Sequence, residues 1–289
     1  MKEIVDGLWF IEGENKGRYP HAHSIFLEGE ENILVDTGAG SVLKDLIPKI
    51  RQVFLTHYHR DHVALSHLFT GAKFLMHPVD APGVESLEGF YRLTGLDHVD
   101  IDAYWKIVRQ VKFEPIKIDC YLQEGDYLEG ARLDVKVLHF PGHTAGHCGL
   151  LVEKCGLVFA TDIDLTTFGP WYGNPASDIK KFRQSIRRLR AIKPDILITG
   201  HTAPINKHLD QKLAEYEAVI DQRDEAILSA LRKEPLNLDQ LVDKKIIYKR
   251  HYGQEVLRHF EKSIVEKHLQ DMIECGKIAI MPDSTIEVL

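Results

Sequence analysis

The sequence predicts a fold that mixes β-strands with α-helices, arranged as one large or two modest domains. Short apolar runs bounded by glycine and polar residues recur through the first two thirds of the chain, as expected of buried strands. Amphipathic helical segments separate some of these runs and dominate the last third. Several runs end directly in histidine or aspartate, an arrangement that brings reactive side chains to one edge of a sheet.

Composition excludes several classes of protein. The chain has 289 residues, 44% hydrophobic and 27% charged, which is enough apolar material to fold without disulfides. Its formal net charge of -7 gives no general attraction to nucleic acids or anionic membranes. The four cysteines lack CxxC spacing, the N-terminus does not resemble a secretory signal, and no apolar run approaches the ~18–20 residues of a membrane span. We therefore expect a soluble cytoplasmic protein with reduced thiols and no membrane partner.

The chain begins with a predicted antiparallel arrangement of three strands, at residues 7–11, 24–27 and 32–35. The third strand leads into Asp36 on a Gly-rich turn. Its carboxylate would either form the turn or orient a metal ligand, and the sequence leaves both roles open. A short helix is expected over 41–50, followed by an apolar strand at 53–55.

That strand is followed by the most distinctive stretch of the chain, which runs from Thr56 to His62. Imidazole and carboxylate are ligands that suit zinc and similar divalent ions. His57 and His59, two apart at a strand end, can point the same way and share one ion. Asp61 and His62 lie beyond the ensuing turn and would reach a second ion, about 3.5–4 Å from the first. The alternative is a polar loop that is rich in histidine and binds no metal.

A helix from about 63 to 69 and a strand at 73–76 follow, and the strand ends at His77, for which a structural role is favoured over metal binding. Residues 80–118 have helix-like spacing and interrupt the strand pattern, which predicts a helical insertion that could act as a lid. Its aromatic side chains are interpreted as packing residues rather than substrate contacts: Phe90, Tyr91, Tyr104 and Trp105.

Strand patterning then resumes, at residues 133–138, 149–152, 156–160 and 195–199. Before the last of these strands, the pattern predicts an amphipathic helix over 178–193 with Ser177 as its N-cap. This helix carries seven basic residues against one acid, and we interpret them as a solvated face. Between Asp162 and the helix, residues 164–173 form the best candidate for a substrate-binding loop, with an apolar wall of Phe168, Trp171 and Tyr172. Packing against the helical insertion is the alternative role for these three side chains.

One regularity connects the distant parts of the chain. His57, His143, Asp162 and His201 each stand just beyond the carboxyl end of a short apolar strand. Scattered structural histidines would have no reason to do so, whereas neighbouring strands bring such positions to one edge of a sheet. The sequence therefore predicts a metal site there.

These residues resemble the metallo-β-lactamase superfamily. The HxHxDH signature is present as His57, His59, Asp61 and His62, and Asp36 is the early aspartate. The later motifs follow in order: His143 after Pro141-Gly142, Asp162 after Thr161, and His201 after Gly200. The resemblance spans residues 24–201 and implies a four-layer αββα sandwich. It also implies two metal ions, with zinc favoured and iron or manganese as alternatives. One ion would be held by His57, His59 and His143 and the other by Asp61, His62 and His201, with Asp162 bridging them.

This arrangement favours hydrolysis. Two dications with neutral imidazoles and two carboxylates would lower the pKa of a bridging water towards neutrality, which supplies a hydroxide nucleophile. Asp61 or Asp162 would help to orient it as catalytic groups, while the metals stabilise the charge that develops on the substrate. No metal-independent nucleophilic triad is evident in the sequence.

Residues 206–289 are expected to form a second domain after a catalytic domain of residues 1–205. Helical patterning covers residues 210–232 and 256–275, and a second helix with Asn237 as its cap lies between these ranges. A closing hairpin follows the last helix. This pattern is similar to the winged-helix module of the β-lactamase-like protein 2 subgroup. Over 211–289 there are 12 Lys and Arg against 15 Asp and Glu, so packing or homodimerisation is favoured over nucleic-acid binding.

Three functions are therefore compared. The first is a binuclear metal-dependent hydrolase, with zinc favoured, that acts on a small-molecule ester, thioester or lactone. The second is a metal-dependent endoribonuclease, suggested by the C-terminal module and the basic helix. The third is an iron-dependent dioxygenase, because relatives of that class keep the same ligands. The sequence does not identify the substrate.

Overall fold

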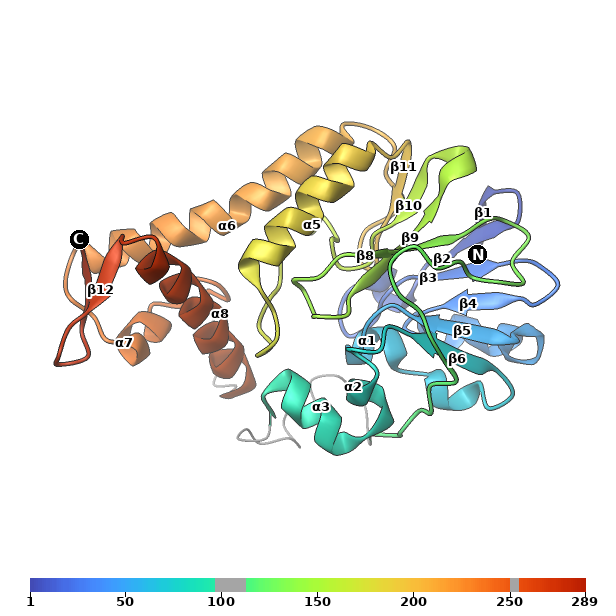
Figure 1. Cartoon of the computed structure of the whole chain (residues 1–289), viewed down its shortest axis with the longest axis horizontal. Helices are drawn as coiled ribbons and strands as arrows, with labels where there is room; N and C mark the ends of the chain where they lie inside the picture. The colour runs from blue at the N-terminus through green and yellow to red at the C-terminus, as the bar shows by residue number, and fades with distance from the viewer. Residues whose placement is uncertain (97–112, 250–254) are drawn as a thin grey trace.

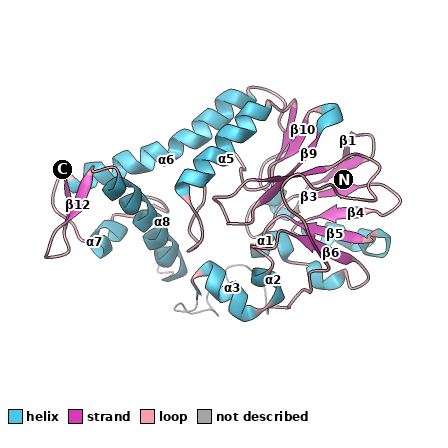
Figure 2. Ribbon diagram, in the orientation of Figure 1, coloured by secondary structure: helices cyan, strands magenta, loops and turns pink. Residues whose placement is uncertain are grey.

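The computed structural model describes residues 1–96, 113–249 and 255–289 and shows the predicted mixture of strands and helices. Two β-sheets lie together in one half of the molecule, with helices above and below them, and the C-terminal helices and hairpin extend to the other side (Figure 1). Colouring by secondary structure makes the layers clear (Figure 2). The fold is a four-layer αββα sandwich with a mostly helical C-terminal module.

The first sheet contains seven strands in chain order: β1 (Lys2–Val5), β2 (Leu8–Ile11), β3 (Ser24–Leu27), β4 (Ile33–Val35), β5 (Gln52–Leu55), β6 (Lys73–Met76) and β7 (Cys120–Tyr121). The pairs from β1 to β4 are antiparallel, and those from β4 to β7 are parallel. The carboxyl ends of β4, β5 and β6 therefore meet at one edge, which receives Asp36, His57 and His77.

The second sheet has the strand order β11-β10-β9-β8, with bounds β8 (Lys136–His139), β9 (Cys148–Val152), β10 (Leu157–Phe159) and β11 (Ile196–Ile198). β10 and β11 are parallel, and β9 is antiparallel to both β8 and β10. β8, β10 and β11 consequently run in one direction. Their carboxyl ends lead towards His143, Asp162 and His201, so the predicted convergence has a simple topological basis.

Side-chain alternation along the strands separates the layers. In β5, Phe54 belongs to the core between the sheets, while Val53 and Leu55 belong to the core under the outer helices. In β10, Phe159 faces the inter-sheet core and Val158 faces the opposite layer. Since successive side chains of a strand point to opposite faces, fully apolar strands are what a sheet buried on both sides requires.

Short helices cover the outer face of the first sheet: η2 (Gly40–Lys49), α1 (Arg60–Val63), η3 (Ser66–Leu68), α2 (Pro82–Glu85) and α3 (Leu87–Thr94). Two other 3-10 turns lie between strands, η1 (Glu14–Gly17) and η5 (Glu153–Cys155). The outer face of the second sheet is covered by α5 (Ile179–Ile192). The predicted helix over 63–69 is therefore two short pieces. Its first piece, α1, contains Asp61 and His62.

The insertion predicted over 80–118 is helical in its first part, where α2 and α3 lie. The second helical stretch, with Tyr104 and Trp105, falls outside the described residues, so the lid stays a prediction. Phe90 is fully buried in the core below the first sheet, as expected of a packing residue.

Helix α5 corrects one expectation and adds to another. Its N-cap is Asp178, whose side chain accepts a hydrogen bond from Lys181 N, and not Ser177. Ser177 instead donates to the carbonyl of His143 at 2.7 Å. The basic residues of α5 lie on a partly exposed face, and five of them also form ion pairs with acidic side chains outside the helix: Arg183 with Asp221, Arg187 with Glu217, Arg190 with Asp210, Lys180 with Asp271 and Glu274, and Arg188 with Glu124.

The C-terminal module consists of α6 (Leu209–Leu231), α7 (Leu238–Asp243), α8 (Glu255–Glu274) and the hairpin of β12 (Ile278–Ile280) and β13 (Ile286–Val288). Asn237 caps α7 through a capping box with Gln240, as the sequence predicts for the cap. The likeness to a winged helix stays a prediction. The module is not a separate unit in its packing, since one apolar cluster runs from Phe182 of α5 through Ile220 of α6 to Ile264 of α8.

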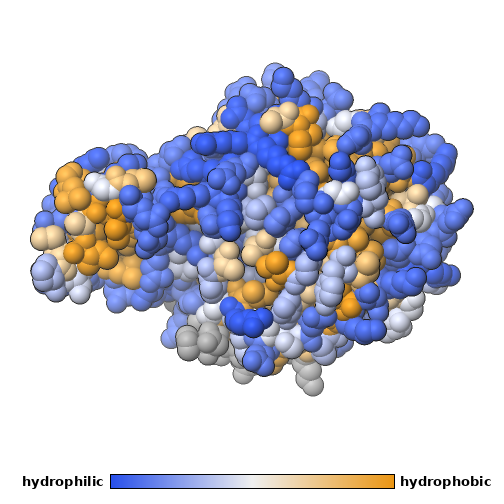
Figure 3. Space-filling model, in the orientation of Figure 1, coloured by the Kyte–Doolittle hydropathy of each residue, from blue (hydrophilic) through white to orange (hydrophobic). Residues whose placement is uncertain are grey.

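The surface is mainly hydrophilic on the face shown in Figure 3, with an apolar patch at the end that carries the C-terminal hairpin. Ile280, Met281 and Leu289 are exposed in this hairpin. A homodimer could bury this patch, and dimerisation stays a prediction. Among the described residues, no helix is long and apolar enough to cross a membrane.

The shared core generates a prediction about stability. Ile220→Ala, which removes a fully buried side chain of α6, should lower the free energy of unfolding by about 2–5 kcal/mol. Because the cluster joins α5 to the module, the variant should still unfold in one transition, measured by circular dichroism during urea denaturation. Two separate transitions would show that the module unfolds independently.

Candidate metal centre

Two groups of side chains converge where the edges of the two sheets meet. The first contains His57, His59, His143 and Asp162, and the ligand atoms of these residues all lie within 4.8 Å of one another. The second contains Asp61, His62 and His201 within the same limit. The structure thus brings together all seven residues that the sequence singled out as metal ligands, in the predicted grouping. Their role as ligands is a proposal.

Asp162 lies between the two groups. Its Oδ2 is 3.1 Å from His143 Nε2 and 3.8 Å from His57 Nε2. Its Oδ1 is 2.9 Å from His62 Nε2 and 3.7 Å from His201 Nε2. One carboxylate oxygen therefore faces each group, as a ligand shared between two ions would require. Asp61 completes the second group, with Oδ2 3.3 Å from His201 Nε2.

The donor set fits divalent metal ions. In the described part of the chain, His62 Nε2 and Asp162 Oδ1 are buried and make no hydrogen bond of suitable geometry, although they lie 2.9 Å apart. In the first group, His59 Nδ1 and His143 Nε2 lie 2.8 Å apart, both within reach of a single ion. Buried polar atoms without partners are costly, and a cation would satisfy those of His62 and Asp162.

The protonation of the histidines differs between the groups. Burial lowers the pKa of His57 and of His59 well below the ordinary histidine value, so both are neutral and ready to bind an ion. Burial also opposes the charged form of His62, but the carboxylates of Asp162 and Asp36 raise the pKa of this residue to about 10. An ion in the second group would therefore displace a proton from His62.

Asp36 orients His62 of the second group through Nδ1, the ring nitrogen that faces away from the centre. Its Oδ2 accepts from His62 Nδ1 at 2.7 Å and from the Thr56 hydroxyl at 2.8 Å, and its Oδ1 accepts from Thr56 N at 2.9 Å. A carboxylate on the far nitrogen fixes the tautomer that presents Nε2 to the centre. Asp36 also has φ +58°, a left-handed backbone that is uncommon outside glycine. Of the two roles that the sequence left open, the structure favours the orienting one.

Other ligands are oriented by backbone or amide groups. His143 Nδ1 donates to the carbonyl of Trp171 at 2.8 Å, and His201 Nδ1 donates to the carbonyl of Gly17 at 2.7 Å. The carboxamide of Asn174 contacts His59 Nε2 at 2.5 Å. Sequence reasoning did not identify Gly17 or Asn174, because neither belongs to a motif with ligand spacing. Only the fold brings them to the site.

His147 is a third residue that sequence reasoning missed. It is fully buried, donates from Nδ1 to the carbonyl of Phe140 at 2.9 Å, and accepts from Asp162 N through Nε2 at 3.2 Å. The hydroxyl of Thr161 also contacts Nε2. Thr161 has φ +43°, which is strained for a β-branched residue. His147 therefore holds the turn that aims Asp162 between the two groups. Its position four residues after His143 was the signal that sequence reasoning could have used to find it.

His77 lies outside both groups, in agreement with the structural role expected of it. Its ring stacks on that of His139 at 4.5 Å between centroids. Nearby, the buried carboxylate of Asp80 accepts from Gly146 N at 2.7 Å and from the Thr144 hydroxyl. Together these residues support the loop that presents His143.

The aromatic residues of the loop 164–173 have three different environments. Trp171 is half-buried beside the centre, with ring centroids 5.2 Å from His59 and 5.6 Å from His143. Tyr172 is fully buried and contacts His268 of α8. Phe168 packs against Tyr248 at 5.3 Å. Of the three residues predicted to form a wall, only Trp171 borders the metal centre. The contacts described for the other two include residues of the C-terminal module.

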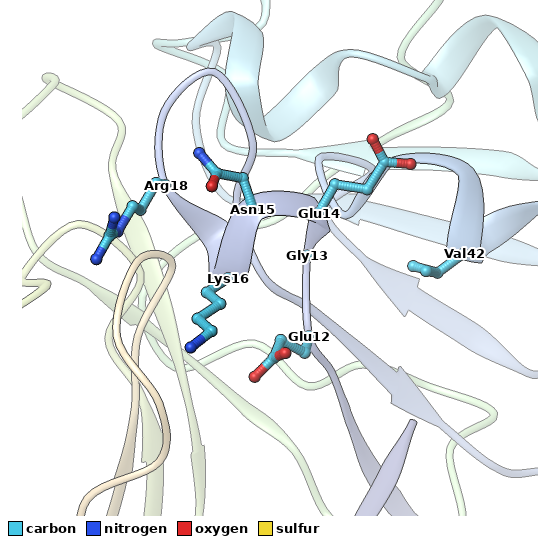
Figure 4. Close-up of a pocket in the computed structure, with 7 residues that line it drawn as sticks. All are labelled: Glu12, Gly13, Glu14, Asn15, Lys16, Arg18 and Val42. Atoms are coloured by element: carbon cyan, nitrogen blue, oxygen red, sulfur yellow. The ribbon is translucent and has the colours of Figure 1, made fainter.

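A surface hollow of about 490 Å³ lies over the turn that contains Gly17, lined by Glu12, Gly13, Glu14, Asn15, Lys16, Arg18 and Val42. Figure 4 shows that its charged side chains point in different directions and do not converge. It includes none of the residues of the two groups. We therefore assign the chemistry to the buried histidine centre and not to this hollow.

Comparisons with known proteins agree with the geometry. Residues 19–201 match the family described as the Metallo-beta-lactamase superfamily. The chain is 27% identical to the beta-lactamase-like protein 2 homolog of Drosophila melanogaster over 264 residues, which cover 87% of this chain and 82% of that protein. It is 28% identical to a hydroxyacylglutathione hydrolase of Cereibacter sphaeroides over 60% of this chain and 58% of that one. The human acyl-coenzyme A thioesterase MBLAC2 is 23% identical over 56% and 65%, respectively.

Among solved structures, a metallo-beta-lactamase family protein of Thermus thermophilus has a TM-score of 0.79 with 24% identity, over 99% of this chain and 100% of that one. This similarity extends through the C-terminal module and confirms the fold. It carries no information about substrate.

The position of Asp36 generates a prediction about metal affinity. Asp36→Ala should weaken binding at the second group by about 10- to 100-fold, because His62 loses the partner that fixes its tautomer. Competition with a chromophoric zinc chelator measures this change. Asp45→Ala, at an exposed position on η2, is the matched control and should leave the affinity unchanged. Equal affinities for the Asp36→Ala and wild-type proteins would contradict the orienting role.

The buried His77 generates a prediction about pH. Burial lowers the pKa of His77 to about 4. The unfolded chain therefore takes up a proton at this residue below about pH 6.5 while the folded chain does not. The stability due to neutral His77 is complete above that pH and is lost as the pH falls towards 4.

Urea denaturation of chelator-treated protein at pH 7.5 and pH 5 measures the effect. His77→Leu should lose less free energy of unfolding between the two pH values than the wild type does. His67→Leu, at an exposed histidine, should behave as the wild type. The same pH dependence in His77→Leu and the wild type would contradict the prediction.

Proposed function

The chain belongs to the metallo-beta-lactamase superfamily, and from this premise we propose that it is a binuclear hydrolase, with zinc as the favoured ion, that cleaves a small-molecule ester, thioester or lactone. The observation that carries the proposal is the position of Asp162, with one carboxylate oxygen towards each of two histidine-rich groups. A mononuclear or purely structural site would not require a second set of candidate ligands beside the first in the same buried region.

The residues have distinct tasks in this proposal. His57, His59 and His143 would hold one ion, Asp61, His62 and His201 the other, and Asp162 would contact both. When bound, the ions would lower the pKa of a water molecule between them and stabilise negative charge on the substrate oxygen. Asp61 and Asp162 would orient that water by accepting its hydrogen bonds. Asp36 and His147 would keep His62 and Asp162 in place.

Two relatives favour an acyl compound as the substrate. One is a hydroxyacylglutathione hydrolase and another is an acyl-coenzyme A thioesterase. The half-buried ring of Trp171 beside His59 and His143 provides an apolar surface next to the reacting bond. A thioester with an apolar acyl group is therefore the first substrate class to test.

The alternatives make different demands on the chain. A ribonuclease needs basic side chains that are free to meet phosphates. In α5, however, Arg183, Arg187 and Arg190 are engaged with acidic residues of α6, which reduces the charge available to RNA. An iron dioxygenase would use the same ligands, so metal analysis has to distinguish it. Both are less favoured than the hydrolase.

Elemental analysis and hydrolysis assays test the proposal. The purified protein should contain about two zinc ions per chain and should hydrolyse a panel of acyl thioesters. His57→Ala and Asp162→Ala should each lower kcat/KM by more than about 100-fold, since each removes several kcal/mol of charge stabilisation. His67→Ala, at an exposed histidine, is the matched control and should keep full activity.

Other outcomes would redirect the proposal. Full hydrolytic activity of chelator-treated, metal-free protein would exclude the metal mechanism. Iron in place of zinc, together with oxygen uptake, would favour the dioxygenase. Metal-dependent cleavage of single-stranded RNA that is lost on charge reversal of Lys180, Lys181, Arg187 and Arg188 would favour the ribonuclease.

A further inference from the structure

The loop 164–173 connects the metal centre to the C-terminal module. Gly169 has φ +81°, and a Cβ atom there would lie 2.4 Å from Val219 of α6, so the loop can approach this helix only with glycine at that position. Two residues later, the carbonyl of Trp171 accepts from His143 Nδ1. The same short segment therefore touches α6 and a candidate ligand.

Arg223 of α6 fixes the backbone of this loop. Its guanidinium donates to the carbonyl of Pro170 at 2.5 Å, to that of Phe168 at 2.7 Å and to the Tyr172 hydroxyl at 2.9 Å. The arginine is buried, and it lies over the ring of Phe168 at 5.0 Å. A planar group with several fixed donors defines the path of the loop on both sides of Trp171.

Two further residues of the module hold the Trp171 ring. The indole N–H donates to the Tyr248 hydroxyl at 2.6 Å, and the Phe260 ring packs edge-on at 5.2 Å. Tyr248 is itself anchored, because the buried carboxylate of Glu261 accepts from Tyr248 N at 2.8 Å and from Ile247 N at 3.0 Å. The indole is thus held between the C-terminal module and the histidines of the first group.

We propose that Trp171 is a specificity-determining residue that receives the apolar group of the substrate, and that Tyr248, Phe260 and Arg223 of the C-terminal module are the positioning residues that set its place. This inference rests on the proposed hydrolase function for the identity of the reaction. It assigns the module a part in building the substrate site, which agrees with its slightly acidic charge and its shared core with α5.

The indole itself provides a readout that does not need activity. The chain has three tryptophans, so W9F and W105F together leave Trp171 as the single fluorescent indole. In this background, Tyr248→Phe should shift the emission maximum of Trp171, because the N–H loses its hydrogen-bond partner. Tyr121→Phe, at an exposed tyrosine of β7, is the matched control and should leave the spectrum unchanged. An unchanged spectrum for Tyr248→Phe would overturn the positioning role.

Substrate selectivity gives the second readout. For a series of acyl thioesters of increasing chain length, Tyr248→Phe should raise KM for the longer acyl groups by about 2- to 10-fold, which corresponds to the loss of one hydrogen bond. Trp171→Ala should abolish the difference in KM between long and short acyl groups, whereas Trp171→Phe should restore part of it. Wild-type selectivity in Trp171→Ala would overturn the role of Trp171.

The two proposals fail in different ways. If the wild type hydrolyses none of these compounds but Tyr248→Phe shifts the emission of Trp171, the proposed reaction is wrong and the positioning by the module stands. If the wild type is an active thioesterase whose chain-length selectivity is unaffected by Trp171→Ala, the hydrolase stands and the specificity role is wrong. Circular dichroism of each variant confirms that the fold is intact before the comparison.

Discussion

The rest of the structure depends on the carboxylate of Asp162 standing between two sets of imidazoles. That position requires five histidines and a second aspartate, drawn from segments more than 140 residues apart, to meet in one buried wall. Two sheets packed face to face meet this requirement, because β5 of one sheet and β8, β10 and β11 of the other lead to the same edge. Strands that are apolar on both faces make this stacking stable, and the reactive residues begin where the apolar runs stop.

A buried cluster of this kind is costly unless every polar atom has a partner. The outward ring nitrogens of His62, His143 and His201 find theirs in Asp36 and in the carbonyls of Trp171 and Gly17, so that the inward nitrogens remain available. Strained backbone accumulates at the same place, with positive φ at Asp36 and Thr161. Strain at a functional site is maintained by the packing around it, and here the surrounding cores of both sheets supply that packing.

The C-terminal module is in contact with the part of the fold that carries the candidate metal centre. Its helix α6 pairs with the basic residues of α5, and its buried Arg223 holds the loop from which Trp171 reaches His143. A basic helix and a helical module together suggested nucleic-acid binding as an alternative. Many of the charges that motivated this idea form ion pairs with one another at the protein surface, and the role that we propose for the module is instead to shape a small-molecule site.

The sequence by itself identified the candidate ligands, their division into two groups, the strands that carry them and the cap of α7, because these depend on local spacing and on the ends of apolar runs. It also indicated Asp36, whose motif position is local. Only the tertiary structure decided the rest. Asn174 and the carbonyl of Gly17 have no spacing signal, since they reach the centre through contacts between distant segments. His147 has one, its position four residues after His143, but its role is set by the contact with Asp162 N that the fold makes. In the same way, Phe168, Trp171 and Tyr172 have similar side chains, and their different roles follow from which of them faces His143 and which faces α6.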